Sequence, residues 1–281
     1  HVGMVMRTIP QVLPTIDGFG LPQVLKDIAM TKRGLVIMVG ATGSGKSTSL
    51  AAMVDWRNEN AHDHIITVED PVEFVHAHKN CVITQREVGI DTEDWDIALK
   101  NSLRQAPDVI LMGEVRDRKT MELAVAFAET GHLCMATLHA NSANQALDRI
   151  INFFPEERRD QLLMDVSLNL KALISQRLIP RQEGKGRTAA VEIMLNTPLM
   201  ADLIFKGQVG ELKELMKRSR ELGMQTFDQA IFDLYEGQVI TYEDALRNAD
   251  SVNDLRLQIK LNSKRGKSPD LAAGTEHFSI V

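Results

Sequence analysis

Five short runs of apolar and β-branched residues recur along the first two thirds of the chain and predict buried β-strands. They cover residues 35–39, 65–68, 109–112, 133–138 and 189–194. A strand with one wet face would alternate between apolar and polar positions, and these runs do not. Continuous apolar runs are typical of parallel strands that are covered on both faces.

Segments with a helical spacing of apolar residues lie between these runs. They cover residues 47–60, 94–105, 117–130, 144–154 and 156–177. The last has the clearest apolar stripe, made by Leu162, Leu163, Val166, Leu170, Leu173 and Ile174. Strands that alternate with helices predict an α/β fold, with a mostly parallel sheet and helices over both of its faces.

After Asn196 the pattern contains helical segments only. They cover residues 198–205, 211–222, 226–236 and 241–248. They predict a small helical subdomain, and the polar residues 181–187 predict an exposed hairpin loop before it.

Shifts in composition set the expected domain boundaries. We expect the end of a largely missing domain and a linker at 1–20, an α/β core at 21–196 and the helical subdomain at 197–261. Residues 262–281 are rich in Ser, Lys, Gly and Pro and are expected to form a disordered tail. The start has neither the basic head nor the cleavage site of a signal peptide. Because the chain begins with His1, we expect a segment of a longer protein.

The composition is that of an ordinary globular protein. Of 281 residues, 44% are hydrophobic and 25% are charged, which excludes a fibrous or wholly disordered chain. No run reaches the ~18 apolar residues of a membrane-spanning helix, so a soluble protein is expected.

Cys81 and Cys134 lack disulfide or zinc spacing, which fits a reducing cytosol. A net charge of −6 makes nucleic acid an unexpected partner unless basic residues cluster locally.

A glycine-rich segment between the first predicted strand and the next helix predicts a phosphate-binding loop. It consists of Gly40, Ala41, Thr42, Gly43, Ser44, Gly45, Lys46, Ser47 and Thr48. Its glycines let the loop amides point inward, and the helix N-terminus adds partial positive charge. Lys46 would reach the β and γ phosphates, and Ser47 would hold Mg²⁺. The alternative is a glycine-rich turn that precedes a helix by chance, but the length of the match favours a bound nucleoside triphosphate.

Two groups of acidic residues follow predicted strands, at the edge where open α/β sheets bind ligands. One group is Glu69, Asp70 and Glu73, and the other, beside Arg116, is Glu114 and Asp117. Phosphoryl transfer to water needs carboxylates near the metal and the attacking water, so these acids are candidates for that role. The second group resembles a Walker B motif with Gly-Glu where an Asp is usual. A helix N-cap or a solvated turn is the alternative for each acid, above all for Glu69 and Asp117.

Histidines supply further candidates. His132 and His139 flank the fourth predicted strand at an odd offset, so they would lie on opposite faces and ~23 Å apart, too far to share a metal. His139 falls at the catalytic edge, where it would contact the γ phosphate or relay its presence; a buried structural role is the alternative. The pairs His62/His64 and His76/His78 have metal-ligand spacing, but without a nearby further ligand they are expected to be surface loop residues.

Five segments together resemble the secretion-ATPase superfamily. They are GATGSGKST from residue 40, VEDPVEF from 68, LRQAPDVILMGEVRD from 103, GHLCMATLHANSA from 131 and GMQTFDQAIFDLY from 223. The first four are similar to the Walker A motif, Asp box, Walker B motif and His box of that superfamily, in the same order. Within it, the chain most resembles the PilT/PilU family of type IV pilus retraction motors, from residue 8 to residue 260. The linker and the C-terminal helices are similar to the accessory branch of that family.

The resemblance implies a RecA-like core that hydrolyses ATP with Mg²⁺. It implies that Lys46 and Ser47 bind the phosphates and Mg²⁺, that Glu73 is the base that orients water, and that Glu114 supports the metal and the water. It also identifies His132 and His139 as the His-box pair.

The resemblance further implies a homohexamer in which a neighbouring subunit completes each nucleotide site, with Arg7 as one candidate arginine. The implied partners are a PilT-like retraction ATPase and a pilus platform protein of the inner membrane. The implied location is the cytoplasm, at the membrane surface below the pilus.

One segment departs from the family pattern. Retraction motors carry Ala-Ile-Arg-Asn-Leu-Ile, and this chain has Leu-Met-Ala-Asp-Leu-Ile at 199–204, so that Ala201 stands in place of the arginine. If the segment couples the motor to the pilus machinery, the change favours a role accessory to a PilT-like motor.

Other functions are weighed against these motifs. An assembly ATPase of type II secretion or pilus extension is the alternative within the superfamily, but such motors carry a four-cysteine metal site and this chain has two unspaced cysteines. A nucleotide or small-molecule kinase, or a GTPase switch, is an alternative of another class. The sequence has no Asn-Lys-x-Asp motif for guanine and no lid-like arginine cluster after the core. A DNA-translocating motor is disfavoured by the net charge.

Overall fold

The computed structural model describes residues 12–265. Arg7, most of the expected linker and all but the start of the expected tail lie outside this range. The chain divides into two compact units: one comprises His1–Leu178 and Ala189–Thr226, and the other comprises Ile179–Thr188 and Phe227–Val281. Each unit is described separately.

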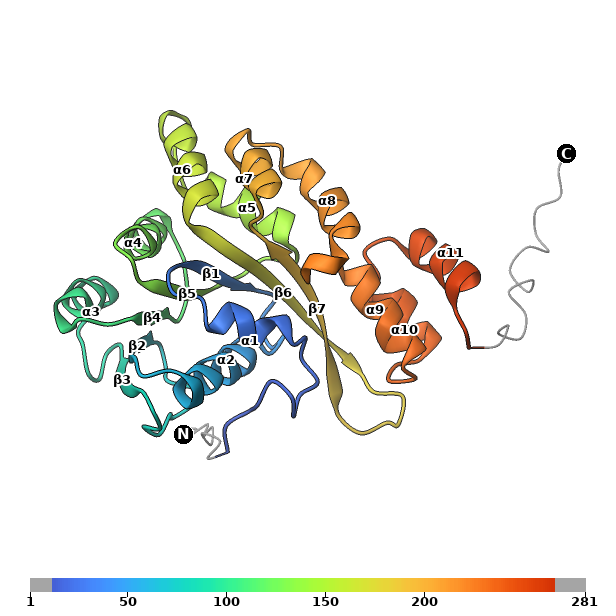
Figure 1. Ribbon diagram of the computed structural model, residues 1–281, viewed down its shortest axis with the longest axis horizontal. Coiled ribbons are helices and arrows are strands. Elements are labelled where there is room, and N and C mark those ends of the chain that lie inside the picture. Colours follow the sequence, from blue (N-terminus) through green and yellow to red (C-terminus); the bar gives the residue numbers. More distant parts are fainter. Residues whose placement is uncertain (1–11, 266–281) are drawn as a thin grey trace, which may run out of the picture. The chain divides into compact units, whose positions relative to one another are not determined.

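A seven-stranded sheet forms the centre of the first unit (Figure 1). Its strands are β1 (Gly34–Val39), β2 (His64–Glu69), β3 (Val82–Glu87), β4 (Val109–Met112), β5 (Leu133–Leu138), β6 (Leu170–Pro180) and β7 (Arg187–Leu195), in the order β3-β2-β4-β5-β1-β6-β7. The pairs β2–β3, β2–β4, β4–β5, β1–β5 and β1–β6 are all parallel. The predicted α/β fold with a mostly parallel sheet is confirmed.

Helices cover both faces of the sheet. One face packs on α1 (Val24–Ala29) and α2 (Lys46–Asn60), and the other packs on α3 (Trp95–Ser102), α4 (Arg118–Glu129), α5 (Ala143–Asn152), α6 (Glu156–Asn169), α7 (Pro198–Phe205) and α8 (Leu212–Arg218). The side chains of β1 alternate between these layers: Leu35, Ile37 and Val39 enter one hydrophobic cluster, and Val36 and Met38 enter the other. This alternation explains why the strand is apolar throughout.

The prediction of one helix over residues 156–177 is wrong in its second half. Helix α6 ends at Asn169, and Leu170 begins β6, which pairs with β1. Leu173 and Ile174 continue the helical stripe in sequence, but they lie in a strand and point to opposite layers. A short apolar run fits either a buried helix or a buried strand, and here the pairing partner decides.

Strand β3 was not predicted, because its sequence Val-Ile-Thr-Gln-Arg-Glu has few apolar residues. It forms one edge of the sheet and pairs only with β2 among the described strands. Its polar side chains Gln85 and Glu87 contact the loop that follows β2.

The second unit contains α9 (Phe227–Glu236), α10 (Tyr242–Asn248), α11 (Val252–Asn262) and the tip of the β6–β7 hairpin. The N-cap of α10 is Thr241, whose hydroxyl accepts a hydrogen bond from the amide of Asp244 at 3.1 Å. The division at residue 227 differs from the expected boundary at 197, because Met200 and Met216 of α7 and α8 join the hydrophobic cluster of the sheet.

Over residues 12–265, helices that combine enough length and apolar character to cross a lipid bilayer are absent.

Candidate active site

The predicted phosphate loop connects β1 to α2, and its backbone requires glycine. Gly45 has φ 86°, and a Cβ there would come within 2.7 Å of the Nε2 atom of Gln176. A Cβ on Gly40 would come within 2.8 Å of the backbone oxygen of Gln176. The loop therefore lies directly against β6, with no room for a side chain at either position.

Gln176 fastens this loop to the sheet. It is 3% exposed, its Nε2 donates to the backbone oxygen of Ser44 at 2.8 Å, and its Oε1 accepts from the hydroxyl of Ser49 at 2.6 Å. One side chain thus holds both the loop and the first turns of α2. Motif analysis missed Gln176 because it lies far along the chain, in a segment that was predicted to be helical.

Lys46 is 8% exposed and binds its own loop. Its Nζ donates to the backbone oxygens of Gly40 at 2.7 Å and Ala41 at 3.0 Å, and it lies 3.5 Å from Nδ1 of His139. Burial lowers the pKa of Lys46, and the negative charges of Glu114 and Glu73 oppose that shift. The lysine is therefore placed among the groups that the sequence assigned to phosphate chemistry.

Glu114 follows β4 and lies between the side chains of His139 and Arg116. Its Oε1 is 3.2 Å from Nε2 of His139, and its Oε2 accepts from Nε of Arg116 at 2.8 Å. The guanidinium of Arg116 also lies 3.6 Å from the carboxylate of Asp70 and faces the ring of Trp95 at 5.6 Å. The structure thus brings Lys46, His139, Glu114, Arg116 and Asp70 to one edge of the sheet.

The residue before Glu114 is glycine for a steric reason. A Cβ on Gly113 would come within 3.2 Å of the backbone oxygen of Val68 and 3.3 Å of Cα of Glu69. An Asp, which is more usual at this point of a Walker B motif, would therefore require β2 to shift by a few tenths of an ångström.

Glu69, at the end of β2, is partly buried. Its carboxylate accepts from the hydroxyl of Thr67 at 2.7 Å and from the backbone of Glu73, and burial raises its pKa. A solvated turn, the alternative weighed for this residue, does not describe it. Glu73 follows in the loop after β2, close enough to act electrostatically on both Lys46 and Glu69.

Other candidates lie away from this edge or have structural roles. Nδ1 of His132 lies 3.0 Å from the hydroxyl of Thr130 and 3.1 Å from the backbone oxygen of Phe127, at the opposite end of β5 from His139. Asp117 caps α4 in a capping box with Thr120, so the helix N-cap that the sequence analysis gave as the alternative for Asp117 is confirmed.

The expectation that His76 is a surface residue is wrong. It is 9% exposed, and with Ser47, Glu69 and Thr137 it lines a cavity of about 30 Å³. His76 is buried because its loop folds back over α2, where Asn58 donates to the backbone oxygen of Ala77 at 2.8 Å. Across residues 12–265, we find no group of three His, Cys, Asp or Glu residues placed to hold a metal by themselves.

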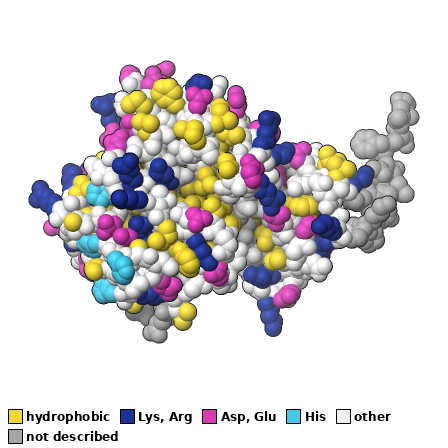
Figure 2. All heavy atoms as spheres, viewed as in Figure 1, with side chains coloured by type: hydrophobic (Ala, Val, Ile, Leu, Met, Phe, Trp, Pro, Cys, Tyr) yellow, Lys and Arg dark blue, Asp and Glu magenta, His cyan; other side chains and the backbone are white. Residues whose placement is uncertain are grey.

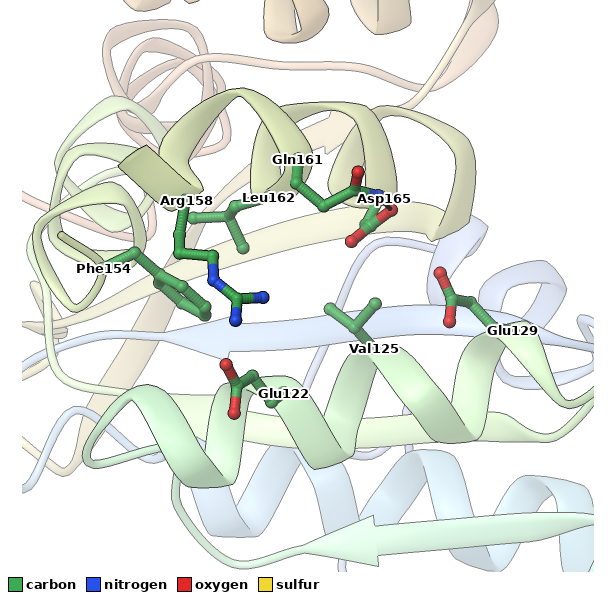
Figure 3. A pocket seen from close by; sticks show the side chains of 8 residues that line it. All are labelled: Glu122, Val125, Glu129, Phe154, Arg158, Gln161, Leu162 and Asp165. Carbon is green, nitrogen blue, oxygen red and sulfur yellow. Dashed lines mark hydrogen bonds between the residues drawn. The ribbon is translucent and has the colours of Figure 1, made fainter. Parts of the chain in front are cut away.

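Two of the larger hollows on the first unit differ in their relation to the phosphate loop. One, of about 190 Å³, lies between α4 and α6, where Figure 3 shows Arg158 and Leu162 of α6 facing Glu122 and Val125 of α4; it contains no predicted site residue. The other, of about 660 Å³, adjoins the phosphate loop at Ala41 and His139. On the face drawn in Figure 2, basic side chains lie interspersed with acidic and apolar ones.

Comparison with known proteins assigns the family. Residues 20–197 match the sequence profile described as "Type II/IV secretion system protein". The chain is 65% identical over 279 residues to the "Type IV pilus ATPase PilU" of Pseudomonas aeruginosa, covering 99% of this chain and 73% of that protein. The chain belongs to the type II/IV secretion system protein family. Within this family it is a member of the PilT/PilU group of type IV pilus ATPases, as its motifs suggested.

A further relative and a solved structure support this assignment to the family. The "Type IV pilus retractation ATPase PilT" of Pseudomonas aeruginosa is 44% identical over 247 residues, covering 88% of this chain and 72% of that protein. The crystal structure of the "Pilus Retraction Motor PilT and Bound ADP" superposes with a TM-score of 0.83 and 39% identity, covering 89% of this chain and 71% of that one. That motor binds ADP on the same fold, which supports the use of a nucleotide by this family member.

Proposed function

We propose that this chain is the motor part of a hexameric ATPase that powers type IV pilus retraction as an accessory to a PilT-like motor. One observation carries the catalytic part: Lys46, His139 and Glu114 form a continuous series of polar contacts beside the phosphate loop. The similarity to PilU and PilT supports the pilus part.

The site fits Mg²⁺ as well as ATP. The hydroxyl of Ser47, at the start of α2, and the carboxylate of Glu114, at the end of β4, supply the oxygen ligands that Mg²⁺ prefers. Mg²⁺ usually takes only one or two protein ligands and shares the rest with phosphates and water. When bound, it neutralises charge on the β and γ phosphates during transfer.

The side chains of the site would have separate roles in binding phosphate, activating water and positioning Glu114. Lys46 would exchange the backbone oxygens of Gly40 and Ala41 for phosphate oxygens. Glu73 would orient the attacking water and accept its proton. Arg116 holds one oxygen of Glu114, which fixes the direction of that carboxylate.

The same similarity to PilU and PilT supports a proposal for assembly and location. A nucleotide at a sheet edge is open on one side, and a neighbouring copy is the simplest source of further cations, with Arg7 as one candidate. We place the ring in the cytoplasm, at the inner membrane below the pilus, in contact with a platform protein and a PilT-like ATPase.

Conservative variants of the two carboxylates test the catalytic assignment. Glu73→Gln and Glu114→Gln keep size but remove the negative charge, so ATP should bind while hydrolysis falls in at least one of them. Glu122→Gln, on the exposed side of α4, is the matched control and should hydrolyse ATP at the wild-type rate. Normal hydrolysis by both site variants would show that these acids are structural.

A cellular experiment tests the biological role. Deleting the gene, with and without a PilT-like motor present, should impair pilus retraction under load but leave pilus extension intact. Loss of surface pili would instead favour an extension motor, and full retraction by this protein alone would contradict the accessory role.

A further inference from the structure

The loop that carries Glu73 is held on both sides of that residue by side chains of two strands. Residues 72–78 form neither helix nor strand, so their backbone polar groups need partners from elsewhere. Asn58 of α2 binds Ala77, and the residues closer to Glu73 are bound by side chains of β2 and β3.

Three consecutive residues of the loop are each bound through the backbone. The amide of Val72 donates to Oε2 of Glu87 at 3.0 Å. The backbone of Glu73 donates to the carboxylate of Glu69. The backbone oxygen of Phe74 accepts from Nε2 of Gln85 at 2.8 Å.

Gln85 is the centre of this arrangement. Besides Phe74, its Oε1 accepts from the amide of His76 at 2.8 Å, and its Nε2 lies 3.4 Å from Oε1 of Glu69. A single amide group thus uses its donor and its acceptor on the loop and also touches the carboxylate that binds Glu73.

The register of the two strands puts these side chains together. Gln85 pairs with Thr67 and Glu87 pairs with Glu69 in the parallel β2–β3 ladder. Residues two apart on a strand share a face, and paired residues of adjacent strands share it too. The edge strand β3 therefore presents a row of polar groups to the loop.

We propose that Gln85 is a positioning residue for Glu73: it fixes the loop backbone, with Glu69 and Glu87, so that the Glu73 carboxylate is held where water is activated. This inference rests on the catalytic role proposed for Glu73. A displacement of about 1 Å at a reacting group costs roughly 100-fold in rate, which is why a loop without secondary structure needs such fastening.

A double-mutant cycle tests the proposal. Gln85→Met keeps the length of the side chain but removes both hydrogen-bonding groups, and it should lower kcat about 10-fold or more while ADP affinity changes less than about 2-fold. In a Glu73→Gln background it should cause little further loss, because the group that it positions is already gone. Val82→Ala, on the same strand with Val82 58% exposed, is the matched control. A kcat for Gln85→Met that equals the control's, or an equal loss in both backgrounds, would overturn the proposal.

Amide hydrogen exchange gives a readout that needs no catalysis. Gln85→Met should speed exchange at His76 but not at Val88, whose amide donates to the backbone oxygen of Glu69 at 2.9 Å within the sheet. Unchanged exchange at His76 would show that Gln85 does not hold the loop. If exchange rises but Glu73→Gln remains fully active, the catalytic role of Glu73 fails instead, and with it the positioning role.

Discussion

Nε2 of His139 lies 3.2 Å from Oε1 of Glu114. The same imidazole has its Nδ1 3.5 Å from Nζ of Lys46, so it lies between the phosphate-binding lysine and the candidate metal-supporting carboxylate. Lys46 begins α2, after the loop that follows β1, whereas His139 directly follows β5 and Glu114 follows β4. Because β4, β5 and β1 are neighbours in the sheet, these contacts join groups from three adjacent strand ends.

Removing the imidazole should separate chemistry from binding. His139→Ala should lower kcat roughly 10- to 100-fold, because a preorganised polar group beside the developing charge is lost. Nucleotide affinity should change little, since the loop amides and Lys46 remain. Steady-state kinetics and ADP titration measure the two effects; His132→Ala, at the far end of β5, is the control. An equal loss of kcat in both variants would show that the substitutions act by disturbing the fold, not through a specific role of His139.

Lys46→Ala should abolish most ATP hydrolysis. The lysine charge serves the phosphates, and its loss should cost roughly 100-fold or more in rate. The fold should persist, because alanine suits the first turn of α2. Circular dichroism would check the fold beside the hydrolysis assay. A rate within a factor of two of wild type would contradict the assignment of the phosphate site.

Gln176→Ala should weaken nucleotide binding. The substitution leaves the hydroxyl of Ser49 and the backbone oxygen of Ser44 without their partner in a buried place, at a cost of about 1–3 kcal/mol. Isothermal titration with ADP and a thermal melt measure affinity and stability. Gln182→Ala, in the loop between β6 and β7, is a control on the same hairpin. Affinity equal to that of the control would show that the loop keeps its shape without Gln176.

Glu69→Gln should change how stability depends on pH. Burial raises the pKa of Glu69 above its ordinary value of 4.5, so ionised Glu69 is less favourable in the folded than in the unfolded chain. The stability that protonated Glu69 contributes to the folded chain is fully present below pH 4.5, and it is lost as the pH rises through the raised pKa. The glutamine has no charge to bury, so the stability of the variant relative to wild type should rise over that window. Denaturant unfolding at several pH values measures it, and a constant difference would contradict the prediction.

Ala201→Arg tests the departure from the family pattern in α7. Ala201 is half-buried on the helix surface, so the change should alter the unfolding free energy by only ~0.5 kcal/mol. If the missing arginine explains the accessory role, the variant should gain some retraction without a PilT-like motor, measured as twitching in cells that lack that motor. Leu199→Arg, at an exposed position two residues earlier, is the control. No gain would show that this position alone does not explain the role.

Local sequence determined the phosphate loop and most of the sheet. A strand, a glycine-rich turn and a helix follow one another within residues 34–60, and their geometry depends on the conformational freedom of glycine more than on distant partners. The buried strands were predictable because burial on both faces requires apolar residues at every position. Thr241 was predictable as a cap because capping acts over three residues.

Tertiary structure alone decided the rest of the site. Residues 170–177 form a strand because they pair in parallel with β1, and this pairing places Gln176 against the phosphate loop. Likewise, β3 exists because it pairs with β2, although its own residues have little apolar pattern, and only this pairing brings Gln85 to the loop of Glu73. Hydrogen bonds between segments far apart in the chain leave no local periodicity in the sequence, so single-sequence patterns cannot reveal them.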